Sequence, residues 1–326
     1  MSNKNAEILN IESISQMASY LQYQRSSMIF IASNYNYNHF KIKKKSGAYR
    51  TILAPDNMHK LIQQKINNSL QIAYKEIDPR CVYGFNNSQP ESIKANAENH
   101  INKKSLLNID IKDFFPSITS VMVRNMFMKE PFNYNEKLAT LMTMLCTYKN
   151  TLPTGAPSSP IISNFIFIDA DEELLKLASK YNLTYTRYAD DLSFSTNNEF
   201  TEDIITEITD IISRFGFELN HKKFRMQNNY NRQIVTGITV NEKVNINRKY
   251  IRNIRAILHN IESNGLLSAS KRYFNLQEQE QAFANKLVLS LRGKIEFVGF
   301  VRGKNDKIYN NLLNRLQVLS KGIIAP

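Results

Sequence analysis

Apolar and polar positions along the chain follow two different spacings. Residues 106–111 form a largely apolar run, which predicts a buried strand that carries a carboxylate, Asp110, at its end. Two β-rich runs, 183–188 and 192–196, flank Ala189-Asp190-Asp191 and predict a hairpin with both aspartates at the turn. Because a buried carboxylate requires a partner, these aspartates are the first candidates for a functional site.

Helical spacing dominates between and after these strands. The long apolar segment 161–180, which follows Pro160, predicts a helix packed on a sheet. Apolar residues recur at 204, 208, 211 and 215, which predicts an amphipathic helix between a Thr201 cap and Gly216. With a further strand near 217–219, the order of elements predicts an α+β layer of the split βαβ kind.

An early hairpin is predicted over residues 40–53, because Ser46-Gly47 separates two strand-like runs and glycine tolerates positive φ in a tight turn. The tip of this hairpin is strongly basic. Its lysines either protect an edge strand from aggregation or contact a ligand, and the pattern leaves both interpretations open.

The chain as a whole is basic, with 42 Lys and Arg against 29 Asp and Glu in 326 residues. A net charge of +13 predicts attraction to a polyanion, either nucleic acid or an acidic membrane surface. No apolar run approaches the roughly 20 residues of a spanning helix, and residues 1–10 lack the apolar stretch of a signal peptide. We therefore expect a soluble, cytoplasmic protein with no membrane partner.

The pattern turns mainly helical from residue 247 onward. One face of the first helix carries apolar residues, and another carries Arg248, Arg252 and Arg255. The apolar face consists of Ile251, Ile254, Leu258 and Ile261. The arginine stripe is suited to follow a phosphate backbone, and a solvated face that aids solubility is the competing interpretation.

Three clustered carboxylates predict a metal site. Asp190 and Asp191 close to Asp110 would raise the pKa of at least one carboxyl group unless a cation compensates. Magnesium takes oxygen ligands and combines one or two carboxylates with substrate phosphates, and two ions stabilise both oxygens of an in-line displacement. An isolated Asp-Asp turn is more often solvated surface, so the prediction depends on the flanking strands and on Asp110.

Three ordered motifs resemble those of reverse transcriptases. They are NIDIKDFFPS at 108–117, LPTGAPSSP at 152–160, and YADD at 188–191 between its two strands. Two shorter stretches, NAENH at 96–100 and VTG at 235–237, resemble the NAxxH and VTG motifs of bacterial retron reverse transcriptases. The resemblance runs from about Arg50 to Gly237 and departs from the family at Thr154, where glutamine is usual.

The resemblance implies the fold of a right-hand polymerase with fingers, palm and thumb. Residues 1–105 would form an N-terminal helical segment and fingers. Residues 106–244 would form the α+β palm, with a split βαβ-like antiparallel sheet plus helices, and 116–155 would belong partly to the fingers. Residues 245–326 would form a helical thumb.

The resemblance also implies catalytic and metal-binding roles. Asp110, Asp190 and Asp191 would be the catalytic carboxylates. Together with the backbone carbonyl of Ile111, they would hold two Mg²⁺ ions, for which Mn²⁺ can substitute.

Nucleotide-binding roles follow from the same resemblance. Arg50 would hold the incoming triphosphate, with help from Lys45, and Phe115 would exclude a ribonucleotide 2′-OH. Lys223 would lie near the leaving pyrophosphate, and the small residues Gly155 and Ala156 would let a nucleotide approach the backbone. Core packing for Phe115 and a surface position for Lys223 are the alternatives.

The retron-like stretches imply recognition of a structured RNA. The residues concerned are Asn96, His100, Val235, Thr236 and Gly237, with the arginine stripe as a further RNA-binding candidate. Without the resemblance, 96–100 is interpreted as a helix cap and 235–237 as a strand that ends in a turn.

The implied function is that of an RNA-directed DNA polymerase of a retron. Such an enzyme uses its cognate non-coding RNA as template, primes from a 2′-OH, consumes dNTPs and yields branched msDNA, and it often serves antiphage defence with a separate effector protein. Two alternatives stay open. One is a group II intron-like or abortive-infection reverse transcriptase, and the other is a catalytically idle RNA-binding scaffold.

Overall fold

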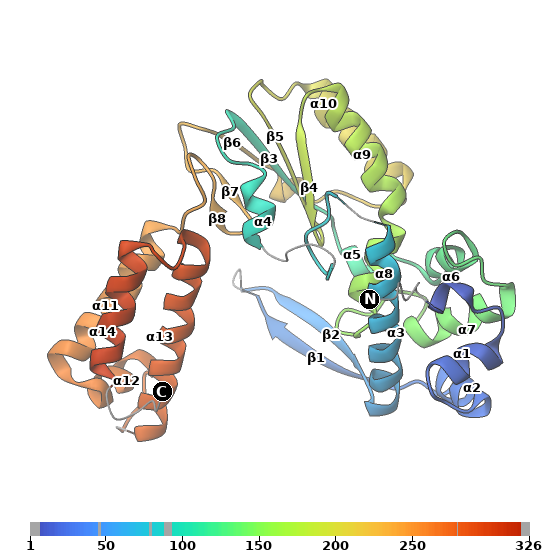
Figure 1. Ribbon diagram of the computed structural model, residues 1–326, viewed down its shortest axis with the longest axis horizontal. Helices are drawn as coiled ribbons and strands as arrows, with labels where there is room; N and C mark the ends of the chain where they lie inside the picture. The colour runs from blue at the N-terminus through green and yellow to red at the C-terminus, as the bar shows by residue number, and fades with distance from the viewer. Residues whose placement is uncertain (1–6, 45–46, 78–79, 88–92, 279, 321–326) are drawn as a thin grey trace. The chain divides into compact units, whose positions relative to one another are not determined.

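The computed structural model describes residues 7–44, 47–77, 80–87, 93–278 and 280–320 (Figure 1). The chain divides into two compact units, Met1–Asn228 and Asn229–Pro326. None of the helices in this described part is long and apolar enough to cross a membrane. The division into fingers, palm and thumb at the predicted boundaries stays a prediction.

The first unit begins with short helices and a hairpin. The elements are η1 (Glu7–Asn10), α1 (Ile14–Tyr20), α2 (Arg25–Ser33), β1 (Tyr37–Lys43), β2 (Tyr49–Pro55) and α3 (Asn57–Glu76). Strands β1 and β2 pair antiparallel from Tyr37 opposite Pro55 to Lys43 opposite Tyr49, which confirms the predicted hairpin. The Asp56 side chain caps α3 by accepting a hydrogen bond from the backbone N–H of His59.

A four-stranded antiparallel sheet forms the centre of the first unit. Its strands are β3 (Ser105–Asp110), β4 (Thr184–Tyr188), β5 (Asp191–Thr196) and β6 (Arg225–Asn228), in the spatial order β4-β5-β3-β6. This arrangement confirms the predicted α+β class with a split βαβ layer.

One predicted strand is wrong. Residues 217–219 make only an isolated bridge between Leu219 and Ile111, and the fourth strand is β6. Phe217 and Leu219 are buried in the core. Packing and two backbone hydrogen bonds, from Lys112 N–H to Glu218 and from Asn220 N–H to Asp110, hold the chain beside the end of β3. It then turns through η2 (His221–Lys223) before pairing resumes.

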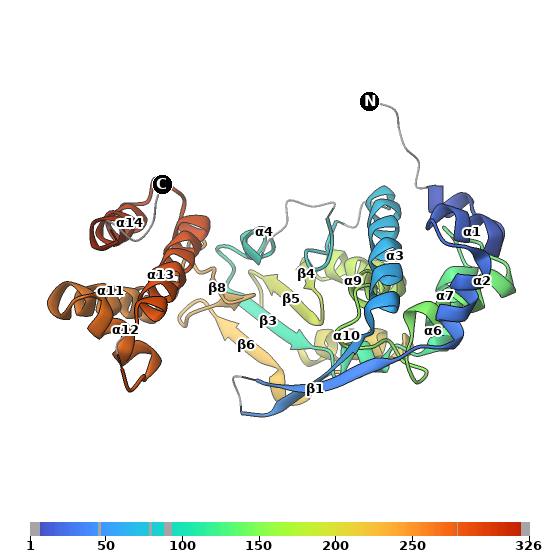
Figure 2. The same cartoon turned by 90° about the horizontal axis from the view of Figure 1, so that it is seen from below.

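Side chains alternate between the two faces of the sheet, as expected for strands. The apolar face carries Leu107, Ile109 and Phe194 into the core with α9 (Ile168–Lys180) and α10 (Glu202–Arg214). The opposite face is polar and lies toward α4 (Ile93–Glu98) (Figure 2). The Thr201 cap of α10 is confirmed, whereas the predicted helix over 161–180 is two helices, because α8 (Ser159–Ile166) and α9 meet at Phe167.

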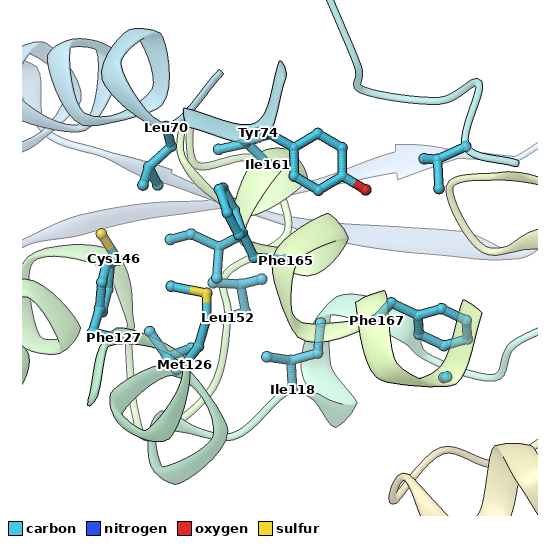
Figure 3. Packing of buried hydrophobic residues seen from close by; sticks show 14 of the residues in the cluster. Leu70, Tyr74, Ile118, Met126, Phe127, Cys146, Leu152, Ile161, Phe165 and Phe167 are labelled. Atoms are coloured by element: carbon cyan, nitrogen blue, oxygen red, sulfur yellow. The ribbon is translucent and has the colours of Figure 1, made fainter. Parts of the chain in front are cut away.

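A second part of the core joins α3, α8, α6 (Ser120–Met128) and α7 (Glu136–Cys146). Figure 3 shows Phe165 of α8 between Tyr74 of α3 and Leu152, and the ring centroids of Tyr74 and Phe165 are 5.0 Å apart. The short helix α5 (Phe114–Ser117) links this core to the end of β3.

In its described residues, 229–278 and 280–320, the second unit consists of a small hairpin and four helices. They are β7 (Ile234–Val235), β8 (Ile238–Thr239), α11 (Arg248–Asn264), α12 (Leu266–Phe274), α13 (Gln281–Arg302) and α14 (Lys307–Leu319). The predicted apolar face of α11 is confirmed, since all four of its residues are buried. Helix α11 packs against α12, α13 and α14.

Candidate active site

Strand pairing brings the three predicted aspartates together where the central strands β3 and β5 meet the turn between β4 and β5. Asp110, the last residue of β3, lies opposite Asp191, the first residue of β5. The backbone N–H of Ile111 donates to the carbonyl of Asp190 at 3.0 Å. The antiparallel register therefore places the end of one strand against the turn of the hairpin.

The turn between β4 and β5 has an unusual backbone. Ala189 has a φ of 58° and is buried, a conformation that costs energy for a residue with a side chain and that needs support from its surroundings. Gly84 lies directly against it, and a Cβ at Gly84 would be 2.5 Å from the nitrogen of Ala189. Only glycine lets the loop of residues 82–85 pack this closely under the turn.

Like charges and burial raise the pKa of two of these carboxyl groups. Desolvation, followed by the charge of Asp110, raises the pKa of Asp190, and the nearby cations Lys223 and Arg50 act in the opposite sense. Although Asp191 is exposed, the surrounding protein partly desolvates it, and with the charges of Asp190 and Asp110 this raises the pKa of Asp191 to about 6. The cluster is thus short of positive charge.

Lys223 supplies part of that positive charge in this arrangement. Its Nζ donates to both carboxylate oxygens of Asp110, at 2.7 and 2.8 Å, and the Asn220 amide lies 3.4 Å from Oδ2. The Asp110 side chain is only 11% exposed, whereas that of Lys223 is 56% exposed. The lysine therefore reaches in from solvent to neutralise a largely buried acid.

The oxygen donors fit a hard divalent cation. Within the described residues, no three His, Cys, Asp or Glu side chains are closed around a common metal position. Three carboxylates nevertheless meet here, two of them with a raised pKa, so an additional cation would be stabilised. Asp110, Asp190, Asp191 and the Ile111 carbonyl are the oxygens that would hold it.

A cleft of about 490 Å³ opens beside the carboxylates. Six of the predicted site residues line it, namely Arg50, Asp110, Ile111, Phe115, Asp190 and Lys223, and so does Thr154. Asp191, Gly155 and Ala156 are not among its lining residues. Arg50 comes from β2 and Phe115 from α5, so the hairpin of the first unit faces the end of the sheet across this space. Lys45 lies outside the described residues.

The glycine-containing segment after Leu152 packs against this hairpin. The backbone N–H of Leu53 donates to the carbonyl of Thr154 at 2.7 Å, and a Cβ at Gly155 would lie 2.6 Å from the Ile52 side chain. Close packing on β2 therefore accounts for the glycine, and Ala156 is itself buried. Direct nucleotide contact by Gly155 and Ala156 stays a prediction.

The two adjacent phenylalanines of α5 differ in their surroundings. Phe114 is buried among Phe167 and Phe217 and belongs to the core. Phe115 is only partly buried and lines the cleft, with its ring centroid 6.0 Å from that of Phe85. Phe115 is thus positioned to contact a molecule in the cleft.

A buried ion pair behind the turn was not predicted from the sequence. Arg187 of β4 is fully buried, and its guanidinium contacts the Asp171 carboxylate of α9 through Nε–Oδ1 at 2.9 Å and Nη2–Oδ2 at 2.6 Å. The sequence carried one signal, because Asp171 is in phase with Leu174 and Ala178 on the buried face of α9. Buried charges require partners.

The same arginine extends this network to the turn itself. Its Nη1 donates to the carbonyl of Ala189 at 3.3 Å and to the Asn164 amide oxygen at 3.0 Å. The Asn164 amide group donates in turn to the carbonyl of Gly84 at 3.0 Å. Arg187 and Asn164 thus fix both the strained turn and the glycine loop beneath it.

The predicted RNA-binding residues Asn96 and His100 lie inside the first unit. His100 is buried, and its ring nitrogens are each 2.7 Å from a hydroxyl, Ser195 Oγ on β5 and Thr186 Oγ1 on β4. Asn96 is also buried, and neither of its amide atoms has a hydrogen-bond partner among the described residues. Neither side chain is at the surface, so any role in RNA recognition would be indirect.

The other predicted RNA-binding residues belong to the second unit. Thr236 and Gly237, with φ of 47° and 86°, form the two-residue turn between β7 and β8, and Val235 is buried. Arg248, Arg252 and Arg255 are exposed on α11. Their contact with RNA stays a prediction.

Comparisons with known proteins agree with the motifs. The sequence pattern of the family described as reverse transcriptase (RNA-dependent DNA polymerase) matches residues 42–245. Retron Ec86 reverse transcriptase of Escherichia coli is 33% identical over 72% of this chain and 72% of its own length. Retron Mx65 reverse transcriptase of Myxococcus xanthus is 31% identical over 69% of this chain, and the match spans only 56% of that relative.

Among solved structures, telomerase from Candida albicans, in complex with a TWJ fragment of telomeric RNA, superimposes with a TM-score of 0.49 and 11% identity. The superposition covers 89% of this chain and 64% of the telomerase chain.

Removing Arg187 should destabilise the protein strongly. Arg187→Met leaves the Asp171 carboxylate buried without its partner, which typically costs about 3–5 kcal/mol of unfolding free energy. Urea denaturation measures the change. Arg214→Met is the matched control, because Arg214 pairs with Glu173 of the same helix at the surface, and its loss should cost less than about 1 kcal/mol. Equal effects of the two substitutions would contradict the role of Arg187.

The buried His100 ring should make stability depend on pH. Burial lowers the pKa of His100 to about 3, whereas the unfolded ring titrates near 6.5. Below about pH 6.5 the ring is protonated in the unfolded chain but neutral in the folded chain. The free energy of unfolding therefore falls as the pH drops below about 6.5. Relative to His100→Gln, the wild type should lose about 1 kcal/mol of unfolding free energy for each pH unit between the two pKa values. Parallel stability curves would exclude this assignment.

Proposed function

The chain belongs to the bacterial retron reverse transcriptases, and we propose from this premise that it is an RNA-directed DNA polymerase that copies its own non-coding RNA. The observation that carries the proposal is the cleft in which Asp110 and Asp190 face Arg50 and Phe115. Carboxylates opposite a fixed cation and an aromatic ring suit a nucleoside triphosphate, which carries negative phosphates and a sugar.

Two Mg²⁺ ions, with Mn²⁺ as a substitute, would be held by Asp110, Asp190, Asp191 and the Ile111 carbonyl. When bound, such ions stabilise the attacking and the leaving oxygen in phosphoryl transfer. Lys223 would then give up its two hydrogen bonds to Asp110 and neutralise the pyrophosphate from the same side of the cleft. The lysine suits this change because its side chain is more than half exposed.

The remaining cleft residues would bind and select the dNTP. Arg50 would hold the triphosphate, assisted by Lys45, and the Phe115 ring would exclude a 2′-OH. Gly155 and Ala156 would contribute backbone surface, and Thr154 would line the position where the family usually has glutamine. All of them except Lys45 and Ala156 lie on the cleft or pack on the β2 strand that forms its wall.

The template would be the cognate retron RNA, with a 2′-OH of that RNA as primer and branched msDNA as product. In the second unit, Thr236 and Gly237 with Arg248, Arg252 and Arg255 would bind this RNA, and the buried Val235 would support the turn. Asn96 and His100 would act indirectly, by holding α4 on the hairpin that carries the aspartates. We further propose that the enzyme works in the bacterial cytoplasm, in antiphage defence with a separate effector protein.

Cells that carry the native locus should contain a small DNA joined to RNA. Treatment with a debranching enzyme should release the DNA, whereas Asp190→Asn should abolish it, because the substitution removes a negative charge from the carboxylate cluster. RNA that copurifies with the protein should be unchanged in the variant. A free, unbranched DNA would favour an intron-like or abortive-infection enzyme, and copurifying RNA without any DNA would favour a scaffold.

The arginine stripe should contribute to RNA binding through charge. Replacing Arg248, Arg252 and Arg255 by alanine should weaken binding and reduce the slope of log K against log salt by roughly 2, since each phosphate contact contributes about 0.7 for a single strand. A control with alanine at Arg272, Lys286 and Lys307 removes three exposed cations from other helices of the same unit. An unchanged slope in the first variant would favour a merely solvated face.

A further inference from the structure

A polar hollow of about 540 Å³ lies between the loop that precedes β7 and the start of α11. It is confined to the second unit and is separate from the cleft described above. Its volume is within the range of small-molecule sites, which is roughly 300–1,000 Å³. The lining consists of Asn229, Tyr230, Asn231, Arg232, Thr239, Asn241, Asn245, Ile246, Asn247 and Arg248.

Hydrogen bonds hold the walls of this hollow in place. The Asn241 amide group donates to the carbonyls of Asn229 and Asn231 at 3.2 and 2.8 Å, and its oxygen accepts from the backbone N–H of Gln233. On the other wall, Thr239 and Asn245 exchange two backbone hydrogen bonds of 2.9 Å. The loop is therefore tied at both ends and presents its side chains in a fixed setting.

Tyr230 stands on the rim of the hollow with almost no protein contact. The residue is 93% exposed, the highest value for any large hydrophobic or aromatic residue among those described. The loop backbone on either side is held by Asn241, so the ring does nothing for packing of the unit. An open aromatic face of this kind can stack on a planar ligand.

The hollow carries positive charge and no acidic side chain. Arg232 and Arg248 line it, and neither has an ion-pair partner in the part of the chain that the structure describes. Asparagine side chains line the same space; the amide oxygens of Asn245 and Asn247 accept hydrogen bonds within the protein, and their NH₂ groups are hydrogen-bond donors. A fitting ligand is thus a planar, hydrogen-bonding group attached to an anion.

We infer that this hollow binds one unpaired nucleotide of the partner RNA, with its base stacked on Tyr230 and its phosphates near Arg232 and Arg248. Sequence-specific recognition of RNA commonly uses splayed single-stranded bases held by an aromatic ring and polar side chains. The α11 stripe begins at Arg248, so the phosphates that follow the bound nucleotide have further cations along the helix. The inference rests on the proposed function for the identity of the nucleic acid.

Ultraviolet crosslinking of the complex tests the site without any catalytic step. The full chain is expressed with its native locus, purified with its RNA, irradiated and digested with trypsin. Cleavage after Arg225 and Arg232 isolates the peptide 226–232, which contains Tyr230 as its one aromatic residue. Mass spectrometry should find this peptide joined to a ribonucleotide. Crosslinks on other peptides but none on this one, or a deoxynucleotide adduct here, would overturn the inference.

Substitutions at Tyr230 test the stacking directly. Tyr230→Ala should weaken binding of the copurified RNA about tenfold, whereas Tyr230→Trp should bind as the wild type does, because only the ring face is required. Tyr273→Ala is the matched control, since Tyr273 is another exposed tyrosine of the same unit. An affinity of Tyr230→Ala equal to that of the wild type would contradict the inference.

Extension of an oligo(dT) primer on poly(rA) separates this inference from the proposed function. Tyr230→Ala should extend that primer as the wild type does, because the substitution leaves the carboxylate cleft intact. Failure of the wild type to extend any primed RNA would refute the polymerase function, while the crosslink at 226–232 would still report on the nucleotide site. Loss of extension in Tyr230→Ala alone would count against a site dedicated to the partner RNA.

Discussion

The geometry of the aspartate turn depends on the buried ion pair between Arg187 and Asp171. Removing two charges from water costs several kcal/mol per ion, so a pair of this kind contributes little net stability by itself. It persists because each guanidinium nitrogen donates a hydrogen bond, to the carboxylate, the Asn164 amide oxygen or the Ala189 carbonyl. The guanidinium also lies 4.6 Å from the Phe167 ring centroid. The Arg187–Asp171 pair therefore holds the strained turn at Ala189 in a single position.

The three carboxylates destabilise the folded state through their mutual repulsion and partial burial. Bringing Asp110 beside Asp190 and Asp191 concentrates negative charge where burial already disfavours it, as the raised pKa of Asp190 and of Asp191 shows. The sheet tolerates this because Lys223 neutralises Asp110. A site that is short of cations when empty is well suited to take up metal ions and a polyphosphate chain together.

Two retron-like motifs occupy contrasting environments. In NAENH, Asn96, Ala97 and His100 are buried, and the histidine joins both strands of the aspartate hairpin from the polar face of the sheet. VTG forms a tight turn in the unit that also holds a hydrogen-bonded loop, an exposed tyrosine and two arginines with no ion-pair partner among the described residues. The first motif is therefore suited to position the catalytic hairpin, and the second region is suited to meet RNA directly.

The sequence by itself determined the α+β class, the hairpins, the helical C-terminal part and the aspartates, because strand and helix periodicities and turn residues act over a few positions. Only the tertiary structure decided that His100 is buried, that Gly155 packs on β2, that Leu219 makes a bridge instead of a strand, and that Arg187 and Lys223 hold acids. These contacts join residues from 16 to 113 positions apart. Such pairings depend on how the elements pack, which local spacing does not encode.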